Sequence, residues 1–248
     1  MTTYRELQRR TATIKTMLVE YSRLPESIVE NIIQYAKVVV NPEREIIDEF
    51  AFNSQMTTQF DFSNLYIICR MMRVLKSKQY QKYLSEKGSI ENELSVEEFC
   101  LCVCTFLTQN QDTQINWVFA VYDSDGDGAL SRRDLYTFLR PCILHAEDMD
   151  FDGETKDLVE IVMAIVDRDQ NGEVDLEEFR FLVKKNVLYI DLLGQCLPSD
   201  SAMNRFRAKI ENKTNAQVLE LFRKEFVPKD EQLTKRRGSL YPIDLDFP

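Results

Sequence analysis

One segment of the sequence, Asp167–Glu178, limits the folds open to this chain more than any other feature. It reads DRDQNGEVDLEE, with side-chain oxygens at its first, third, fifth and twelfth positions and a glycine at its sixth. That glycine allows a sharp turn, which brings alternate side chains toward one centre. A centre built only from oxygen atoms suits a hard cation such as Ca²⁺, which takes roughly six to eight oxygen ligands. The segment therefore predicts a cation-binding loop between two helices.

The spacing is that of an EF-hand loop, in which the seventh residue offers its backbone carbonyl and a carboxylate at position twelve closes the site. We expect Val174, at position eight, to pair with a partner loop in a short β-bridge. The Ca²⁺ ligands predicted here are Asp167, Asp169, Asn171, the carbonyl of Glu173, and Glu178.

A second loop, Asp123–Asp134, fits the same pattern except at its last position. Aspartate is one methylene shorter than glutamate, so Asp134 is less suited to bind a cation through both oxygens. A site with one oxygen there approaches the six-coordinate geometry that Mg²⁺ prefers. We expect weaker Ca²⁺ binding, with Mg²⁺ or a loop that folds without metal as alternatives. The ligands predicted here are Asp123, Asp125, Asp127, the carbonyl of Ala129, and Asp134.

Both loops end in a repeated pattern: an apolar residue, a small polar residue, two variable residues, an acid or amide, and an apolar residue. Repetition of this kind predicts four helix–loop–helix units. The pattern occurs at Phe60–Leu65, Leu94–Phe99, Leu130–Leu135 and Val174–Phe179.

The first two loops are predicted not to bind metal. Counting back from the repeats, loop one runs from Asn53 to Asn64 and has Thr58 where glycine belongs. Loop two runs from Lys87 to Glu98, and its lysine puts a positive charge at the first ligand position. We expect both loops to persist as scaffolding for paired hands.

A third acidic segment, Asp148–Gly153, begins like a Ca²⁺ loop but has Val159 at position twelve. We interpret it as a linker between the third and fourth hands, with the next helix beginning near Glu154.

The predicted fold is all-α, because apolar residues recur at helical spacing and glycine and proline are scarce, with seven of each. Two paired EF-hand lobes precede a C-terminal helical extension and a flexible tail. The expected domains are the N-terminal lobe at 1–108, the C-terminal lobe at 109–195, and the extension and tail at 196–248.

The composition limits which binding partners and which cellular compartment we expect for this chain. The net charge of −10 disfavours nucleic acid and anionic membranes as partners. We find no targeting segment and no apolar run long enough to span a bilayer, so we expect a cytoplasmic protein without membrane insertion. The six cysteines lack paired metal-ligand spacing, and Cys100, Cys102 and Cys104 lie in an apolar run. They are expected to be reduced, packed thiols.

Catalysis is not expected. The chain has one histidine, His145, and no phosphate-cradling glycine loop or nucleophile–base pair. We therefore predict a binding protein and not an enzyme.

Three stretches resemble the calaxin family of EF-hand proteins, which belong to ciliary outer dynein arms and are related to neuronal calcium sensors. They are Lys156–Ile161, the loop sequence DRDQNG, and Leu192–Asp200 after the last hand. The resemblance covers roughly residues 10–210 and implies a Ca²⁺ sensor or adaptor in the axoneme of a cilium or flagellum. It also implies dynein, docking proteins and tubulin as protein partners. Lys87 departs from the family, whose second loop generally binds metal.

Two alternatives remain. One is a cytosolic sensor that regulates another enzyme or a receptor tail, and the other is a structural axonemal subunit in which metal only stabilises the fold.

The C-terminal extension holds two amphipathic segments, Met203–Ile210 and Ala216–Phe226. Val218–Phe222 either fills a hydrophobic groove until a partner displaces it or packs as core. Further on, Lys235–Ser239 forms a basophilic kinase site, and Ser239 phosphorylation or contact of the basic run with an acidic, tubulin-like surface are both open.

Overall fold

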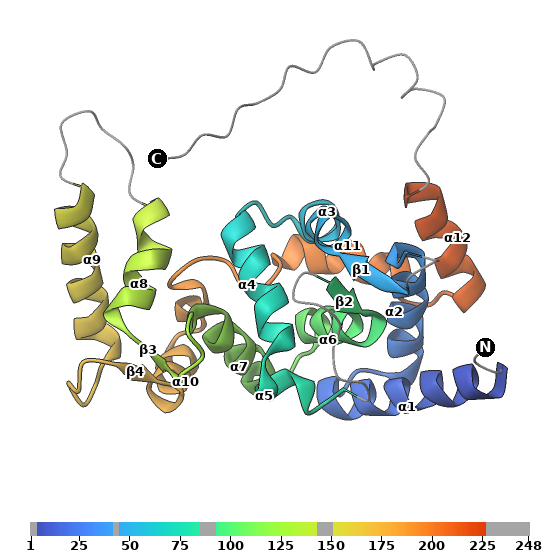
Figure 1. Ribbon diagram of the computed structural model, residues 1–248, viewed down its shortest axis with the longest axis horizontal. Helices are drawn as coiled ribbons and strands as arrows, with labels where there is room; N and C mark the ends of the chain where they lie inside the picture. Colours follow the sequence, from blue (N-terminus) through green and yellow to red (C-terminus); the bar gives the residue numbers. More distant parts are fainter. Residues whose placement is uncertain (1–3, 42–44, 85–92, 143–150, 227–248) are drawn as a thin grey trace, which may run out of the picture.

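The computed structural model describes residues 4–41, 45–84, 93–142 and 151–226, and the described part is mostly helical (Figure 1). This agrees with the predicted all-α fold. None of its described helices has both the length and the apolar content that a bilayer crossing requires. The helices are α1 (Tyr4–Ser22), α2 (Glu26–Val39), α3 (Glu49–Phe60), α4 (Leu65–Lys76), α5 (Lys78–Gln81), α6 (Val96–Leu107), α7 (Gln111–Tyr122), α8 (Arg132–Leu139), α9 (Phe151–Val166), α10 (Leu176–Lys185), α11 (Asp200–Ile210) and α12 (Asn215–Phe226), with 3₁₀ turns at Arg140–Cys142 and Val187–Asp191.

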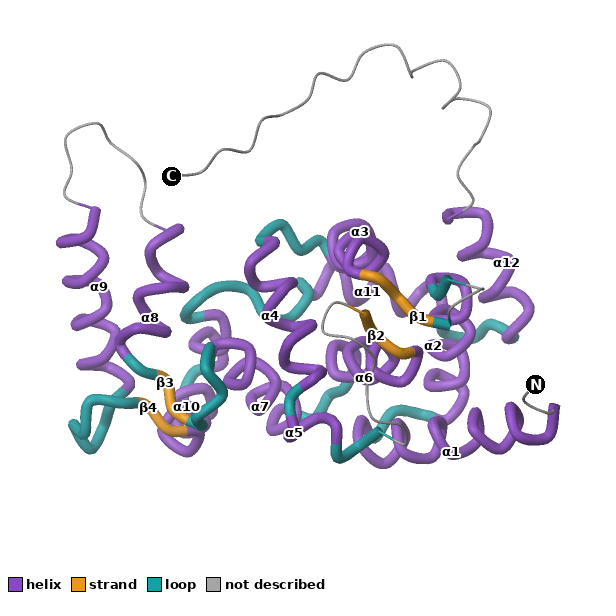
Figure 2. Tube along the Cα trace, viewed as in Figure 1, coloured by secondary structure: helices purple, strands orange, loops and turns teal. Residues whose placement is uncertain are grey.

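Two short antiparallel strand pairs join the hands, as Figure 2 shows. In the C-terminal pair, β3 (Ala129–Leu130) and β4 (Val174–Asp175) align Leu130 with Val174. The predicted β-bridge at position eight is therefore confirmed. Both side chains are buried, so each pairing also anchors its loop to the core.

The N-terminal pair corrects the position of loop one. Strands β1 (Ile46–Asp48) and β2 (Glu93–Ser95) align Ile47 with Leu94, so Ile47 holds position eight. Counted from that pairing, the loop runs from Val40 to Ala51. The predicted loop Asn53–Asn64 is wrong, because its first eight residues belong to helix α3.

Helix capping explains this error. In the other three hands, the residue at position nine caps the next helix in a capping box with the acid at position twelve. Asp48 caps α3 in the same way, but position twelve is Ala51, so the expected acid is missing. Asn64 instead caps α4, accepting from the backbone N–H groups of Tyr66 and Ile67. The N-cap of α4 therefore produced the same sequence pattern as the end of a metal loop.

The acidic linker is partly helical. Helix α9 begins at Phe151, slightly earlier than the predicted start near Glu154, so Gly153 lies inside a helix and not at a loop turn. Residues 148–150 lie outside the described part of the chain.

The C-terminal extension packs on the N-terminal lobe. Helix α12 lies beside α2, at the end of the molecule opposite α8 and α9 (Figure 1). Val218 and Phe222 are fully buried, and the Phe222 ring lies 4.4 Å from that of Tyr35. Asn31 of α2 donates to the backbone carbonyls of Ile210 (2.8 Å) and Lys213 (3.0 Å), which fixes the turn between α11 and α12. Val218 and Phe222 are therefore part of the core in this structure, and their displacement by a partner stays a prediction.

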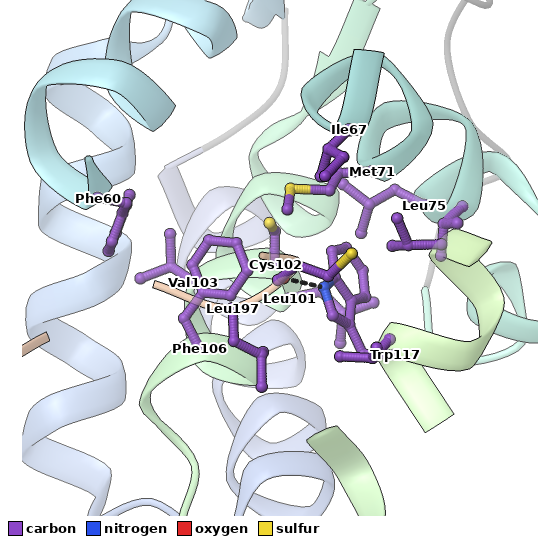
Figure 3. Packing of buried hydrophobic residues seen from close by; sticks show 14 of the residues in the cluster. Phe60, Ile67, Met71, Leu75, Leu101, Cys102, Val103, Phe106, Trp117 and Leu197 are labelled. Carbon is purple, nitrogen blue, oxygen red and sulfur yellow. Dashed lines mark hydrogen bonds between the residues drawn. The ribbon is translucent and has the colours of Figure 1, made fainter. Parts of the chain in front are cut away.

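A continuous core runs from this lobe to the base of the other. Trp117 of α7 is fully buried near Phe106, and its indole N–H donates to the Cys196 carbonyl at 3.2 Å (Figure 3). Trp117 thus lies in the helix that enters the loop Asp123–Asp134.

The cysteines of α6 are free, fully buried thiols, as expected. Burial raises the pKa of the Cys104 thiol to about 12 and that of Cys100 and Cys102 well above the usual range.

Candidate metal centre

The loop Asp167–Glu178 is ordered by hydrogen bonds from its own backbone to its acidic side chains. The Asp167 carboxylate accepts from the N–H groups of Asn171 (3.2 Å) and Gly172 (2.9 Å). Glu178 reaches back from α10 and accepts from the N–H of Arg168 at 2.8 Å and that of Asp169 at 3.2 Å. Gly172 has φ +93°, a left-handed conformation that glycine adopts without strain.

These bonds bring three predicted ligands together. Oxygens of Asp167, Asp169 and Glu178 lie within 4.8 Å of one another. Asn171 and Glu173 lie between them in the same turn, where the Asn171 side-chain oxygen accepts from the Glu173 N–H at 2.8 Å. Three carboxylates this close repel one another, and a divalent cation between them would relieve that repulsion.

The loop Asp123–Asp134 gathers a different trio. Oxygens of Asp123, Asp125 and Asp127 lie within 4.8 Å of one another, with Asp123 buried and the other two exposed. Burial raises the pKa of Asp123, an effect that hydrogen bonds from the backbone of Gly126 and Gly128 oppose. This end of the loop therefore gathers three carboxylates, of which only Asp123 is shielded from solvent.

Asp134 is held by the protein itself. One of its oxygens accepts from the Ser124 N–H at 3.0 Å, and the other accepts from the N–H and hydroxyl of Ser131 at 2.9 and 2.6 Å. Among the described residues, the three-carboxylate cluster of this loop does not include Asp134, whereas that of the other loop includes Glu178. The shorter side chain of Asp134 thus leaves the acid at position twelve outside the cluster in this loop, whereas Glu178 lies inside the cluster in the other.

Glu98, at position twelve of loop two, forms an ion pair with a lysine side chain. Its carboxylate lies 2.8 Å from the Lys76 ammonium and accepts from Gln81 at 2.7 Å. Glu98 is fully buried, and the Lys76 side chain is 14 % exposed. The sequence pattern did not identify Lys76, because it lies outside the loop in α4. Residues 87–92 of this loop lie outside the described part of the chain.

Comparisons with known proteins agree with these loops. Residues 112–184 match the family described as an EF-hand domain pair, which supports Ca²⁺ binding. Calaxin from Xenopus laevis is 25% identical, over 85% of this chain and 98% of that protein. Calaxin from Danio rerio is 32% identical over 46% of this chain and 54% of that protein. A type 2 calcineurin B protein from Rattus norvegicus is 27% identical over 58% of this chain and 96% of that protein. Together, the loops and these relatives support a calaxin-like EF-hand protein.

Proposed function

We propose that this protein is a Ca²⁺ sensor or adaptor that acts through protein contacts and has no catalytic activity. The observation that carries the proposal is the pair of acidic clusters, one on each side of the β3–β4 strand pair. Because the pairing ties the loops together, a cation in one loop affects the geometry of the other. Two coupled sites of this kind suit a regulatory role.

The ligands we assign follow the sequence pattern. In the stronger Ca²⁺ site, the inclusion of Glu178 in the carboxylate cluster supports a closing ligand from α10. In the weaker site, Asp134 lies outside the carboxylate cluster of its loop, which favours Mg²⁺ or low Ca²⁺ affinity. The ligands are Asp167, Asp169, Asn171, Glu173 and Glu178 in the first site and Asp123, Asp125, Asp127, Ala129 and Asp134 in the second.

The mechanism we propose begins at position twelve. Glu178 would give up backbone partners such as the Arg168 N–H on binding a cation, and α10, which carries it, would move with its side chain. Helix α10 contacts both α7 and α9, so its movement is passed to neighbouring helices of the C-terminal lobe. Those helices would then present a changed surface to a protein partner.

The partners we propose are axonemal. The resemblance to the calaxin family implies dynein arms, docking proteins and tubulin as partners, and a location in the cytoplasm of the cilium or flagellum. A structural role in the axoneme is the second candidate, and the Lys76–Glu98 pair favours it because an ammonium group, and not a metal ion, neutralises the last acid of loop two. The match to a calcineurin B protein supports a third setting, the regulation of another enzyme.

Calorimetric titration with Ca²⁺, with and without about millimolar Mg²⁺, tests the proposal. We expect two sites of unequal affinity, with Mg²⁺ competing mainly at the weaker one. Glu178→Gln should abolish the tighter site, because an amide lacks the charge and the second anionic oxygen of the closing ligand. Asp134→Glu should strengthen Ca²⁺ binding at the other loop and reduce the competition by Mg²⁺. Absence of any Ca²⁺ heat in the unaltered protein would refute the proposal.

The location of the protein in the cell distinguishes the axonemal role from the regulation of another enzyme. A tagged copy should accumulate along axonemes in ciliated cells if the axonemal role is correct. A diffuse signal outside cilia would favour the regulation of another enzyme.

A further inference from the structure

Arg70 of α4 is a buried arginine with an unusual set of partners. It is 6% exposed, although arginine is almost never fully buried without a partner. Its guanidinium donates to three backbone carbonyls, those of Val121 (3.2 Å), Ser124 (3.0 Å) and Asp123, the last being the closest contact. Burial lowers its pKa, yet an arginine remains charged at neutral pH.

These carbonyls lie where α7 ends and the first metal loop begins. The last carbonyls of a helix lack partners within the helix and carry its negative dipole end, so a buried cation there is favourable. Val121 belongs to the last turn of α7, and Asp123 and Ser124 are the first two residues of the loop. Arg70 therefore fixes the backbone on both sides of the first predicted ligand.

The contact continues to the last predicted ligand. Ser124, whose carbonyl accepts from Arg70, donates its N–H to the Asp134 carboxylate at 3.0 Å. One residue thus joins the arginine to both ends of the loop. Among the described residues, no side chain donates to the corresponding carbonyls of Asp167 and Arg168 in the other metal loop.

Helix α4 also contacts the helix that leaves this loop. Tyr66, one turn before Arg70, lies with its ring 5.4 Å from that of Phe138 in α8. Phe138 in turn lies 5.3 Å from Tyr122 at the end of α7. A single helix of the N-terminal lobe therefore contacts the helices on both sides of the loop.

We propose that Arg70 is a positioning residue for the metal loop Asp123–Asp134, and that it links cation binding there to helix α4. The inference rests on the proposed function of this loop. Its basis is the fork of the guanidinium, which reaches three carbonyls at once, and a single ammonium cannot reproduce that geometry.

The test is Arg70→Met in the full chain, with Ca²⁺ as the probe in calorimetry. A Glu178→Gln background isolates the first loop. We expect Ca²⁺ affinity at Asp123–Asp134 to fall about 10- to 100-fold, as when a partner that orients a metal ligand is lost. Affinity at Asp167–Glu178, measured without the background change, should fall by less than the affinity at Asp123–Asp134, and binding at that loop reports that the variant is folded. Arg73→Met is the matched control, because Arg73 is an exposed arginine of the same helix.

Two further measurements separate positioning from charge and from general stability. Arg70→Lys keeps the charge but loses the fork, so its affinity should remain reduced. Hydrogen exchange should show that Ca²⁺ slows exchange in α4 of the Glu178→Gln protein but not after Arg70→Met is added.

Tighter binding in Arg70→Met, full recovery in Arg70→Lys, an equal loss at both loops, or unchanged affinity would each overturn the proposal. If the Glu178→Gln protein itself binds no Ca²⁺, the assigned site at this loop has failed, which is a different result from a failure of Arg70.

Discussion

Phe222→Ala should weaken the N-terminal lobe, even though Phe222 lies far along the chain in α12. The Phe222 side chain is fully buried and its ring faces Tyr35 at 4.4 Å and Phe206 at 5.9 Å. Truncating a buried phenylalanine typically costs about 3–5 kcal/mol, from lost transfer energy and the cavity left behind. Each aromatic pair adds about 0.5–1.5 kcal/mol to the interaction.

We therefore expect a loss of about 3 kcal/mol or more in unfolding free energy. For a chain of this size, that corresponds to a fall of roughly 10 °C in Tm. If α12 instead detaches while the rest stays folded, the loss is limited to its docking energy, and binding of a hydrophobic dye should rise. Urea denaturation followed by circular dichroism, together with dye binding, measures both effects.

Phe50→Ala is the matched control, since Phe50 is 84% exposed in α3 and should change stability by less than about 0.5 kcal/mol. Equal stability losses in the two variants, with no gain in dye binding for Phe222→Ala, would refute the packing argument.

Two predictions concern buried polar groups. Lys76→Met should destabilise the protein by about 3 kcal/mol or more, because it leaves the buried Glu98 carboxylate without its ion partner. Adding Glu98→Gln should recover much of that loss in urea denaturation, and failure to recover it would show that the ion pair is not the cause. Cysteine labelling at pH 8 should spare the buried thiols until the protein is denatured, because a raised pKa keeps them protonated. Mass spectrometry of labelled peptides checks this, and rapid native labelling would contradict it at Cys100, Cys102, Cys104 or Cys196.

The sequence predicted the structure best in the two C-terminal loops, where the spacing of metal ligands fixes the register of the chain. Position eight of both C-terminal loops could be found by counting, and Leu130 does pair with Val174. Counting failed for loop one, since Ala51 removes the acid that marks position twelve and only the pairing of Ile47 with Leu94 reveals the register.

Long-range partners could not be predicted from spacing. Lys76 reaches Glu98 across 22 positions, and Arg70 reaches Ser124 across 54. The docking of α12 on α2 likewise depends on tertiary packing, which an amphipathic pattern predicts to exist but does not locate. Ser239 and the kinase site lie outside the described residues, so that hypothesis stays a prediction.

The Lys76–Glu98 pair makes the N-terminal and C-terminal lobes differ in how they depend on metal ions. A lysine ammonium cannot be removed by a chelator or exchanged for another ion, so the charge that balances Glu98 does not depend on the Ca²⁺ concentration. The hand closed by Glu98 would therefore respond to Ca²⁺ only indirectly, through the contacts of α4 with the loop Asp123–Asp134. A partner bound to this lobe would sense the ion through that one helix.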